Sequence, residues 1–268
     1  MRLVDSLEEI ILRKVKGKNM KMVGMLSDVG TVRKLNEDYV GCYEKDIRFY
    51  VVADGMGGHN AGEVASKIAV DSVIKYIKEA KDIKSENLGG ILSKAVEYAN
   101  ENIYKESMKS QKLTGMGTTI TACLIKGSNA VVANVGDSCC YFIKNNDIIK
   151  ITKDHSLVQQ LIDSGTITEE EALSHPNKNI ITRALGTSES VKVDIFELQF
   201  DDVSKGILAT DGLTNVVSAD EIYNVVLNNE KEIACHKLIE LSKQKGSRDN
   251  ISVIVFEGEW RDDRNCTE

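Results

Sequence analysis

Apolar residues recur along the chain with two distinct periodicities. Short runs rich in Val, Ile, Phe and Tyr, several of them alternating with polar residues, predict β-strands. Other segments repeat apolar residues at every third and fourth position, which predicts amphipathic helices. The predicted strands are 49–53, 118–125, 130–135, 140–143, 193–200, 206–210 and 251–256, and the predicted helices lie near 61–73, 88–103, 156–164, 168–174, 219–228 and 231–245.

The order of these elements indicates the fold class. Two helices follow the first strand, hairpin-linked strands then dominate, and helices return toward the C-terminus. A parallel βαβ fold would alternate strand and helix strictly, so the pattern predicts an α+β fold with antiparallel sheets covered by helices. We expect residues 22–258 to form one domain, preceded by an extension (1–21) that is either a short helix or disordered, and followed by a polar tail (259–268).

The composition limits the kinds of binding partner and the cellular compartment that we expect. The 268 residues carry a formal net charge of −7, and an acidic surface repels nucleic acid, so we expect no nucleic-acid partner. No apolar run reaches the roughly 18 residues that a membrane span requires, and no secretory signal pattern is present. The six cysteines contain no CxxC pair, which favours free thiols. We therefore expect a cytoplasmic protein.

Acidic residues stand at the ends of several predicted strands. Asp54 and Asp211 each follow an apolar strand and precede a glycine, Asp137 follows another strand, and Asp249 precedes a fourth. Carboxylates that meet at one sheet edge repel each other unless cations neutralise them. Oxygen ligands without a His or Cys cluster favour hard ions such as Mg²⁺ or Mn²⁺. Asp-Gly is also a common turn sequence, so the spacing alone leaves ordinary turns as an alternative.

A glycine-rich segment over residues 54–63 leads from a predicted strand into a predicted helix. A phosphate-binding P-loop would end in Gly-Lys-Ser/Thr, whereas Gly62 is followed here by Glu63. We therefore expect a tight, ligand-lined turn in place of a nucleotide-binding loop.

Eight short motifs are distributed over most of the chain. They are DVGTVRKLNED (28–38), VVADGMGGH (51–59), GMGTT (115–119), NVGDS (134–138), KDHS (153–156), IITRALG (180–186), ATDGLTN (209–215) and SRDNI (247–251). In this order they resemble the motifs of the metal-dependent protein phosphatase family (PPM, type 2C), most closely its short bacterial members. The resemblance covers roughly residues 22–257.

The resemblance implies a four-layer α-β-β-α sandwich, with two central antiparallel sheets flanked by helix pairs. It also implies two Mn²⁺ or Mg²⁺ ions bound by oxygen ligands. Those ligands would be Asp38, Asp54, Asp211, Asp249 and the carbonyl of Gly55. Asp54 would bridge the two ions.

Further residues match family positions around the two ions. Glu37 would act through a metal-bound water, and Asp137 matches an acid that helps to hold a third, weaker metal in bacterial relatives. Arg33 matches the phosphate-binding arginine, whose planar fork can hold two phosphoryl oxygens. His59 is a candidate general acid, and a turn residue without chemistry is the open alternative for it.

The implied activity is hydrolysis of phosphoserine and phosphothreonine in proteins by a metal-bridged hydroxide. Arg33, Asp54 and Asp211 would act in catalysis, and the substrates would be phosphoproteins, including a bacterial Ser/Thr kinase. We expect a monomer. One alternative is a catalytically weak pseudophosphatase that serves as a regulatory binding module, against which the intact acids argue. A metal-dependent nuclease or nucleotidase is another, which the acidic composition disfavours.

Two local features complete the expectations. Residues 155–190, which we call the flap segment, resemble a mobile element that helps to choose substrates, together with the stretch of chain that returns from it. Its histidines, His155 and His175, are predicted to be solvated or capping residues. Cys139 stands where the family usually has an arginine, which removes an ion pair or hydrogen bond but no metal ligand.

Overall fold

The computed structural model describes residues 22–57, 61–80, 83 and 87–258. The predicted extension over 1–21, the tail over 259–268 and the candidate general acid His59 lie outside the described residues.

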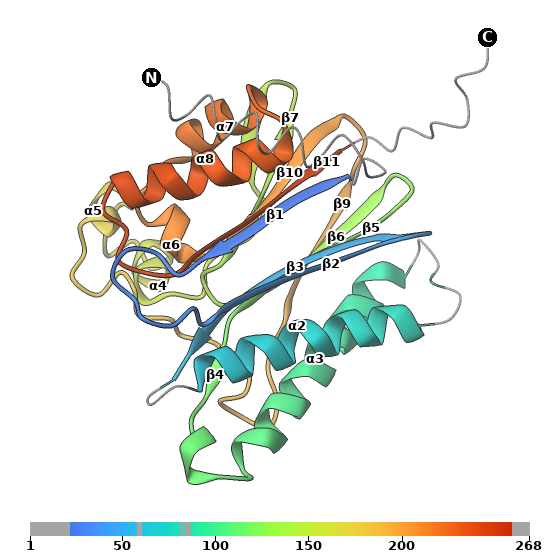
Figure 1. Cartoon of the computed structure of the whole chain (residues 1–268), viewed down its shortest axis with the longest axis vertical. Coiled ribbons are helices and arrows are strands. Elements are labelled where there is room, and N and C mark those ends of the chain that lie inside the picture. The colour runs from blue at the N-terminus through green and yellow to red at the C-terminus, as the bar shows by residue number, and fades with distance from the viewer. Residues whose placement is uncertain (1–21, 58–60, 81–82, 84–86, 259–268) are drawn as a thin grey trace.

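Two antiparallel sheets form the centre of the molecule (Figure 1). In spatial order, the first sheet contains β1 (Val23–Asp28), β11 (Ile251–Glu257), β10 (Val203–Ala209), β7 (Cys139–Lys144) and β8 (Asp147–Lys150). The second contains β2 (Asp38–Glu44), β3 (Arg48–Met56), β5 (Ile120–Lys126), β6 (Asn129–Val135) and β9 (Asp194–Gln199), and the short β4 (Gly117–Thr118) pairs with β3.

Helices cover the outer faces of both sheets (Figure 1). The second sheet carries α2 (Gly62–Glu79) and α3 (Leu88–Ser107), and the first carries α6 (Asp211–Thr214), α7 (Ala219–Leu227) and α8 (Lys231–Gln244). A short 3-10 helix, η2 (Gln111–Leu113), follows α3, while α4 (Leu157–Asp163) and α5 (Glu169–Leu173) lie in the flap segment. The arrangement is the predicted α-β-β-α sandwich.

Three apolar layers hold the sandwich together. Between the sheets, Tyr50 of β3 stacks on Phe256 of β11 with ring centroids 4.2 Å apart, and Phe142 meets Phe256 edge-on. The two outer layers lie between each sheet and its helices. In α2, the buried Ala65 and Ala69 are spaced by one helical turn, and such small side chains allow the helix to approach the sheet closely.

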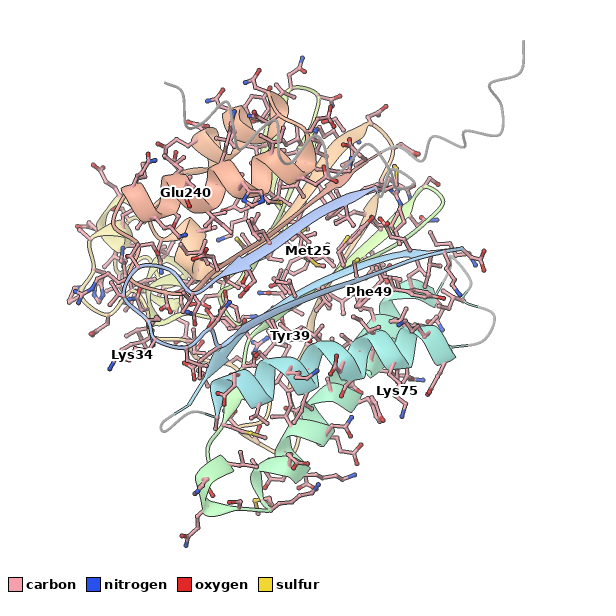
Figure 2. All side chains as sticks on the ribbon, viewed as in Figure 1. Met25, Lys34, Tyr39, Phe49, Lys75 and Glu240 are labelled. Atoms are coloured by element: carbon pink, nitrogen blue, oxygen red, sulfur yellow. The ribbon has the colours of Figure 1, made fainter. Side chains whose placement is uncertain are left out.

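Three strands that the hydrophobic pattern did not predict are β1, β2 and β8. Each lies at a sheet edge; β1 and β2 bury only part of their residues, and β8 has no fully buried residue. An edge strand has fewer neighbours to cover it, so it tolerates polar residues and lacks the continuous apolar run of a central strand. Met25 on β1 and Tyr39 on β2 mark these edges and are partly exposed (Figure 2).

Strand register brings the ends of distant segments together at one end of the sandwich. Asp38 at the start of β2 pairs with Asp54 near the end of β3. In the first sheet, Ala209 at the end of β10 pairs with Val253 of β11 and with Cys139 at the start of β7. The loop between β1 and β2 closes this end, as Lys34 marks in Figure 2.

Candidate active site

Asp38 is held in the sandwich by two hydroxyl groups. It is 5% exposed, and its Oδ2 accepts hydrogen bonds from Thr210 Oγ1 at 2.9 Å and from Ser252 Oγ at 2.6 Å. The other oxygen, Oδ1, is buried without a donor. Burial, together with the charges of Asp211 and Asp249, raises the pKa of Asp38 to about 7, against the lowering effect of the two hydroxyls. One oxygen is therefore oriented by the protein, and the other is left for a ligand.

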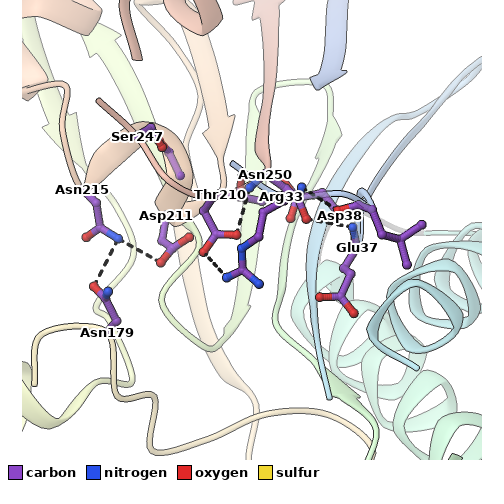
Figure 3. Close-up of polar contacts among 12 residues, drawn as sticks. Arg33, Glu37, Asp38, Asn179, Thr210, Asp211, Asn215, Ser247 and Asn250 are labelled. Carbon is purple, nitrogen blue, oxygen red and sulfur yellow. Dashed lines mark hydrogen bonds and ion pairs between the residues drawn. The ribbon is translucent and has the colours of Figure 1, made fainter. Parts of the chain in front are cut away.

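Asp211 shows the same division between its two oxygens. It is the first residue of α6, where the chain leaves β10, and its Oδ2 accepts a hydrogen bond from Asn215 Nδ2 at 2.9 Å. Its Oδ1 is buried without a donor. Figure 3 shows Asn215 between Asp211 and Asn179 of the flap segment, whose Oδ1 lies 3.5 Å from Asn215 Nδ2. Burial and the charge of Asp249 raise the pKa of Asp211.

Asp54 lies between the other acids. Burial, and then the charges of Asp38, Asp211, Asp137 and Asp249, raise its pKa well above the ordinary aspartate value. Buried carboxyl groups that repel one another in this way are stable only when protons or cations compensate their charges.

Asp137 joins these acids from the turn between β6 and β7. Burial, and then the charges of Asp211 and Asp154, raise its pKa to about 8. Asp154 is itself paired with Lys150, whose Nζ lies 2.8 Å from its carboxylate. We call the five mutually repelling aspartates the acid cluster: Asp38, Asp54, Asp137, Asp211 and Asp249.

The backbone around Gly55 leaves no room for a side chain. A Cβ at Gly55 would lie 2.2 Å from Gly62 O and 2.5 Å from Glu37 O, and the amide of Gly55 donates to Glu37 O. Burial and the nearby charge of Glu63 raise the pKa of Glu37, and Glu63 Oε2 is buried without a donor. The glycine therefore allows the β3 end, the α2 start and Glu37 to meet at the site.

Arg33 lies beside the acid cluster, and Figure 3 shows its side chain in the region of Asp38, Thr210 and Asp211. Its Nη2 is 2.9 Å from Asp249 Oδ2, and the two side chains are 48% and 34% exposed. Burial opposes the charged form, but the charge of Asp249 and its hydrogen bond together raise the pKa of Arg33. The ion pair holds a guanidinium with further donors at the solvent side of the acids, where an anion would arrive.

Asn250 is an important site residue that the sequence did not single out. Its Oδ1 accepts a hydrogen bond from the Glu37 amide, and its Nδ2 donates to Val29 O and Leu35 O, each at 2.9 Å. These bonds close the loop that carries Arg33. Asn250 directly follows the predicted ligand Asp249 in the SRDNI motif, and that position was the only available signal.

The residues fit a hard divalent cation, although the ligand roles stay predictions. In the part of the chain that the structure describes, no group of three or more His, Cys, Asp or Glu side chains is gathered tightly enough to be a preformed metal site. The donors at this end are nonetheless oxygens only, which suits Mg²⁺ or Mn²⁺. The buried Oδ1 atoms of Asp38 and Asp211, which have no hydrogen-bond donor, are acceptors that a cation would satisfy.

An antiparallel sandwich with acids converging at one end and an arginine at the rim defines a class of metal-dependent phosphoester hydrolases. A family model described as protein phosphatase 2C matches residues 31–240, and the chain belongs to this family.

Named relatives agree with this family. The chain is 39% identical over 236 residues to a serine/threonine phosphatase, Stp, of Listeria welshimeri, covering 86% of this chain and 93% of the relative. It is 37% identical to the serine/threonine protein phosphatase PstP of Mycobacterium tuberculosis, covering 85% of this chain and 43% of that longer protein.

Solved structures agree as well. The serine/threonine phosphatase Stp1 of Staphylococcus aureus superposes with a TM-score of 0.84 at 33% identity, covering 91% of this chain and 99% of Stp1. The catalytic domain of PstP in complex with two manganese ions gives a TM-score of 0.76 at 34% identity, over 88% of this chain and 96% of that one.

These findings confirm the predicted fold, family and serine/threonine phosphatase class, and they do not favour the pseudophosphatase alternative. The prediction for His155 as a solvated or capping residue was wrong, because its side chain is 7% exposed and hydrogen-bonded on both ring nitrogens. His175 is half-exposed, and its Nδ1 accepts the Asn177 amide within the turn that follows α5.

Proposed function

We propose that this chain hydrolyses phosphoserine and phosphothreonine in proteins with two Mn²⁺ or Mg²⁺ ions. The observation that carries the proposal is the pair of buried, donor-less oxygens on Asp38 and Asp211 within the acid cluster. Buried ionised carboxylates are unfavourable unless a cation or a proton compensates them. The residues that would hold the ions are Asp38, Asp54, Asp211, Asp249 and the Gly55 carbonyl, with Glu37 acting through a water.

When bound, such a cation pair activates water near neutral pH and offsets charge on a phosphoryl group. The chain's own residues provide orientation. Thr210 and Ser252 fix Asp38, and Asn215 fixes Asp211, so their second oxygens face the site. Arg33 would hold the phosphoryl oxygens, because a guanidinium matches that geometry and carries positive charge where negative charge gathers.

Two finer assignments belong to the same proposal. We propose Asp137 as a ligand of a third, weaker cation. The negative charge of Asp211 raises the pKa of Asp137, and a nearby cation would offset this repulsion. We keep His59 as the candidate proton donor to the leaving alkoxide on the sequence motif alone.

We further propose a monomeric, cytoplasmic enzyme, with residues 22–258 as its catalytic domain and phosphoproteins, including a Ser/Thr kinase, as substrates. The names of the relatives support the substrate class. None of the five described cysteines forms a disulfide, which fits a reducing compartment. Among the described residues, no helix combines the length and apolar character needed for a bilayer crossing.

The first test compares three substrates: a phosphoserine peptide, an aryl phosphate and DNA, each with Mn²⁺ and with a chelator. We expect hydrolysis of the two phosphomonoesters with Mn²⁺ and none with the chelator. Asp211→Asn should lower turnover at limiting metal at least about tenfold, because it removes one charge from the cluster while keeping the shape.

The matched control is Asp71→Asn, the same change at an exposed ion pair with Lys67 on α2. It should behave like the unmodified protein. Turnover that survives the chelator, or an Asp211→Asn variant with normal activity, would contradict the proposal. Tight phosphopeptide binding without hydrolysis would instead support the pseudophosphatase.

A further inference from the structure

His155 joins the flap segment to the turn that carries Asp137. It lies between β8 and α4, and its Nδ1 accepts a hydrogen bond from the Gly136 amide at 3.0 Å. Its own amide donates to Gly136 O at 2.9 Å. One residue therefore holds both polar groups of the glycine that directly precedes Asp137.

Gly136 needs such external support. Its φ is +111°, a backbone conformation that side chains rarely adopt, and a Cβ would lie 2.5 Å from Thr119 Cγ2. Glycine is required here for both reasons, yet it is also the residue with the most backbone freedom. The direction in which Asp137 leaves the turn therefore depends on the hydrogen bonds that fix Gly136. His155 supplies two of them, and Asn134 Nδ2 supplies another to Gly136 O.

The same contacts define the tautomer of His155. Because Nδ1 accepts the Gly136 amide, the proton of the neutral ring lies on Nε2. Nε2 is 3.1 Å from Asp194 Oδ2 on β9, so this N–H donates to Asp194. Arg183 Nη1 lies 2.9 Å from Nε2 and 2.7 Å from Asp194 Oδ1. Since both nitrogens are donors, they converge on the carboxylate rather than bonding to each other.

Backbone hydrogen bonds connect this cluster to the base of the flap segment. Thr182 N donates to His155 O at 2.7 Å, and Leu157 N donates to Ile180 O at 2.8 Å. The two ends of the segment that carries α4 and α5 are thus paired beside His155. Arg183, which holds Asp194, comes from the returning end.

We propose that His155 is a positioning residue that sets the direction of Asp137 and couples it to the flap segment. This inference rests on the proposed function, because Asp137 belongs to the acid cluster. A substrate that shifts the flap segment would move the partners of His155 and thereby the Gly136–Asp137 turn. A histidine that merely fills the core would contribute to stability without affecting that turn.

Two substitutions separate the contacts of the ring. In His155→Asn, the amide oxygen stands near the position of Nδ1, so the acceptor for Gly136 is kept while the bond to Asp194 is lost. In His155→Gln, the longer amide reaches toward Asp194 and leaves the Gly136 amide without its acceptor. The matched control is His236→Gln on the exposed surface of α8.

The readouts are amide hydrogen exchange of residues 134–138 in metal-free protein and the Mn²⁺ concentration for half-maximal aryl phosphate hydrolysis. We expect His155→Gln to speed exchange in this segment and to raise the Mn²⁺ requirement roughly tenfold. His155→Asn should recover most of both properties, and His236→Gln should change neither.

Equal loss of thermal stability in both His155 variants, with unchanged exchange and Mn²⁺ requirement, would overturn the proposal. If His155→Gln fails to fold, His155→Leu fills a similar space without an acceptor for the Gly136 amide and should also speed exchange at residues 134–138. The exchange readout is independent of turnover. An inactive wild-type protein would therefore refute the proposed function, while slow exchange that depends on His155 would still support the positioning role.

Discussion

At the scale of single residues, His155 shows how burial changes the behaviour of a titratable side chain. Burial, with the positive charge of Arg183, lowers its pKa below 6.5, and the bond to Asp194 only partly opposes this. The folded protein therefore keeps the ring neutral, whereas the unfolded chain takes up a proton near the ordinary value. The negative charge of Asp154 also acts on this ring and favours its protonated form.

The sign of the resulting pH dependence is set by this lowered pKa. The stability that His155 contributes should be fully present above pH 6.5 and lost as the pH falls toward the lower pKa of the folded state. The free energy of unfolding should thus decrease more in the wild type than in His155→Asn between neutral and mildly acidic pH. Urea denaturation across this range measures it, and a constant difference between the two proteins would contradict a buried neutral ring.

Motifs and positions at strand ends identified the acids but not the groups that orient them. Asp54, Asp211 and Asp249 are recognisable from their motifs and strand ends. Asn250 and His155 are not, because the value of an amide or an imidazole depends on its partners. Asn250 bonds to residues more than 200 positions earlier in the chain.

At the scale of elements, two helices begin with the same local chemistry but bury different faces. Both α5 and α7 start with a capping box, Thr168 with Glu171 and Ser218 with Glu221. In α7, Ile222 and Val226 are fully buried in the core. In α5, Leu173 is 75% exposed and only Ala172 is buried. We therefore expect the capping box of α7 to contribute to the stability of the whole protein. The capping box of α5 should contribute only to the local stability of the flap segment.

Removing each cap tests this difference. Ser218→Ala should lower the free energy of unfolding by about 1 kcal/mol, because α7 unfolds with the core. Thr168→Ala should leave the global value nearly unchanged and instead increase amide exchange in α5, which contacts little of the core. Urea denaturation and hydrogen exchange on both variants check it. Equal effects on global stability would mean that α5 unfolds together with the sandwich.

The strands show a similar division. Central strands such as β5 and β11 are recognisable by continuous apolar runs, since both of their faces are covered. Among the edge strands, β9 was predicted from its alternating pattern, whereas β1, β2 and β8 were not, because their mixed composition reflects their place in the sheet. That place is a property of the assembled sheet and not of the segment.

At the scale of the whole molecule, folding concentrates negative charge at one end of the sandwich. The acid cluster draws its members from β2, β3, the β6–β7 turn, α6 and the loop that precedes β11. Their repulsion opposes folding, and a cation that binds only the folded state would relieve it. The free energy of unfolding should therefore increase when a metal ion binds.

We expect Mn²⁺ to raise the melting temperature and a chelator to lower it. At a hundredfold excess over its dissociation constant, a ligand adds about 2.7 kcal/mol of stability. Asp54→Asn should make the metal-free protein at least as stable as the wild type and reduce its response to Mn²⁺, since it removes repulsion and a ligand together. Asp71→Asn should respond like the wild type. Thermal denaturation with and without Mn²⁺ measures the effect, and a full response in Asp54→Asn would exclude it as a ligand.

The sequence by itself determined the longer helices, the central strands, the order of the phosphatase motifs and the identity of the acids, but not the short α6 and η2. These are local properties, carried by periodicity and residue chemistry within short segments. Only the tertiary structure decided which carboxylate oxygens remain without a donor, that Asn250 closes the Arg33 loop, and that His155 is buried against Gly136. Each of these depends on strand register and burial, which bring together groups that are far apart in the chain.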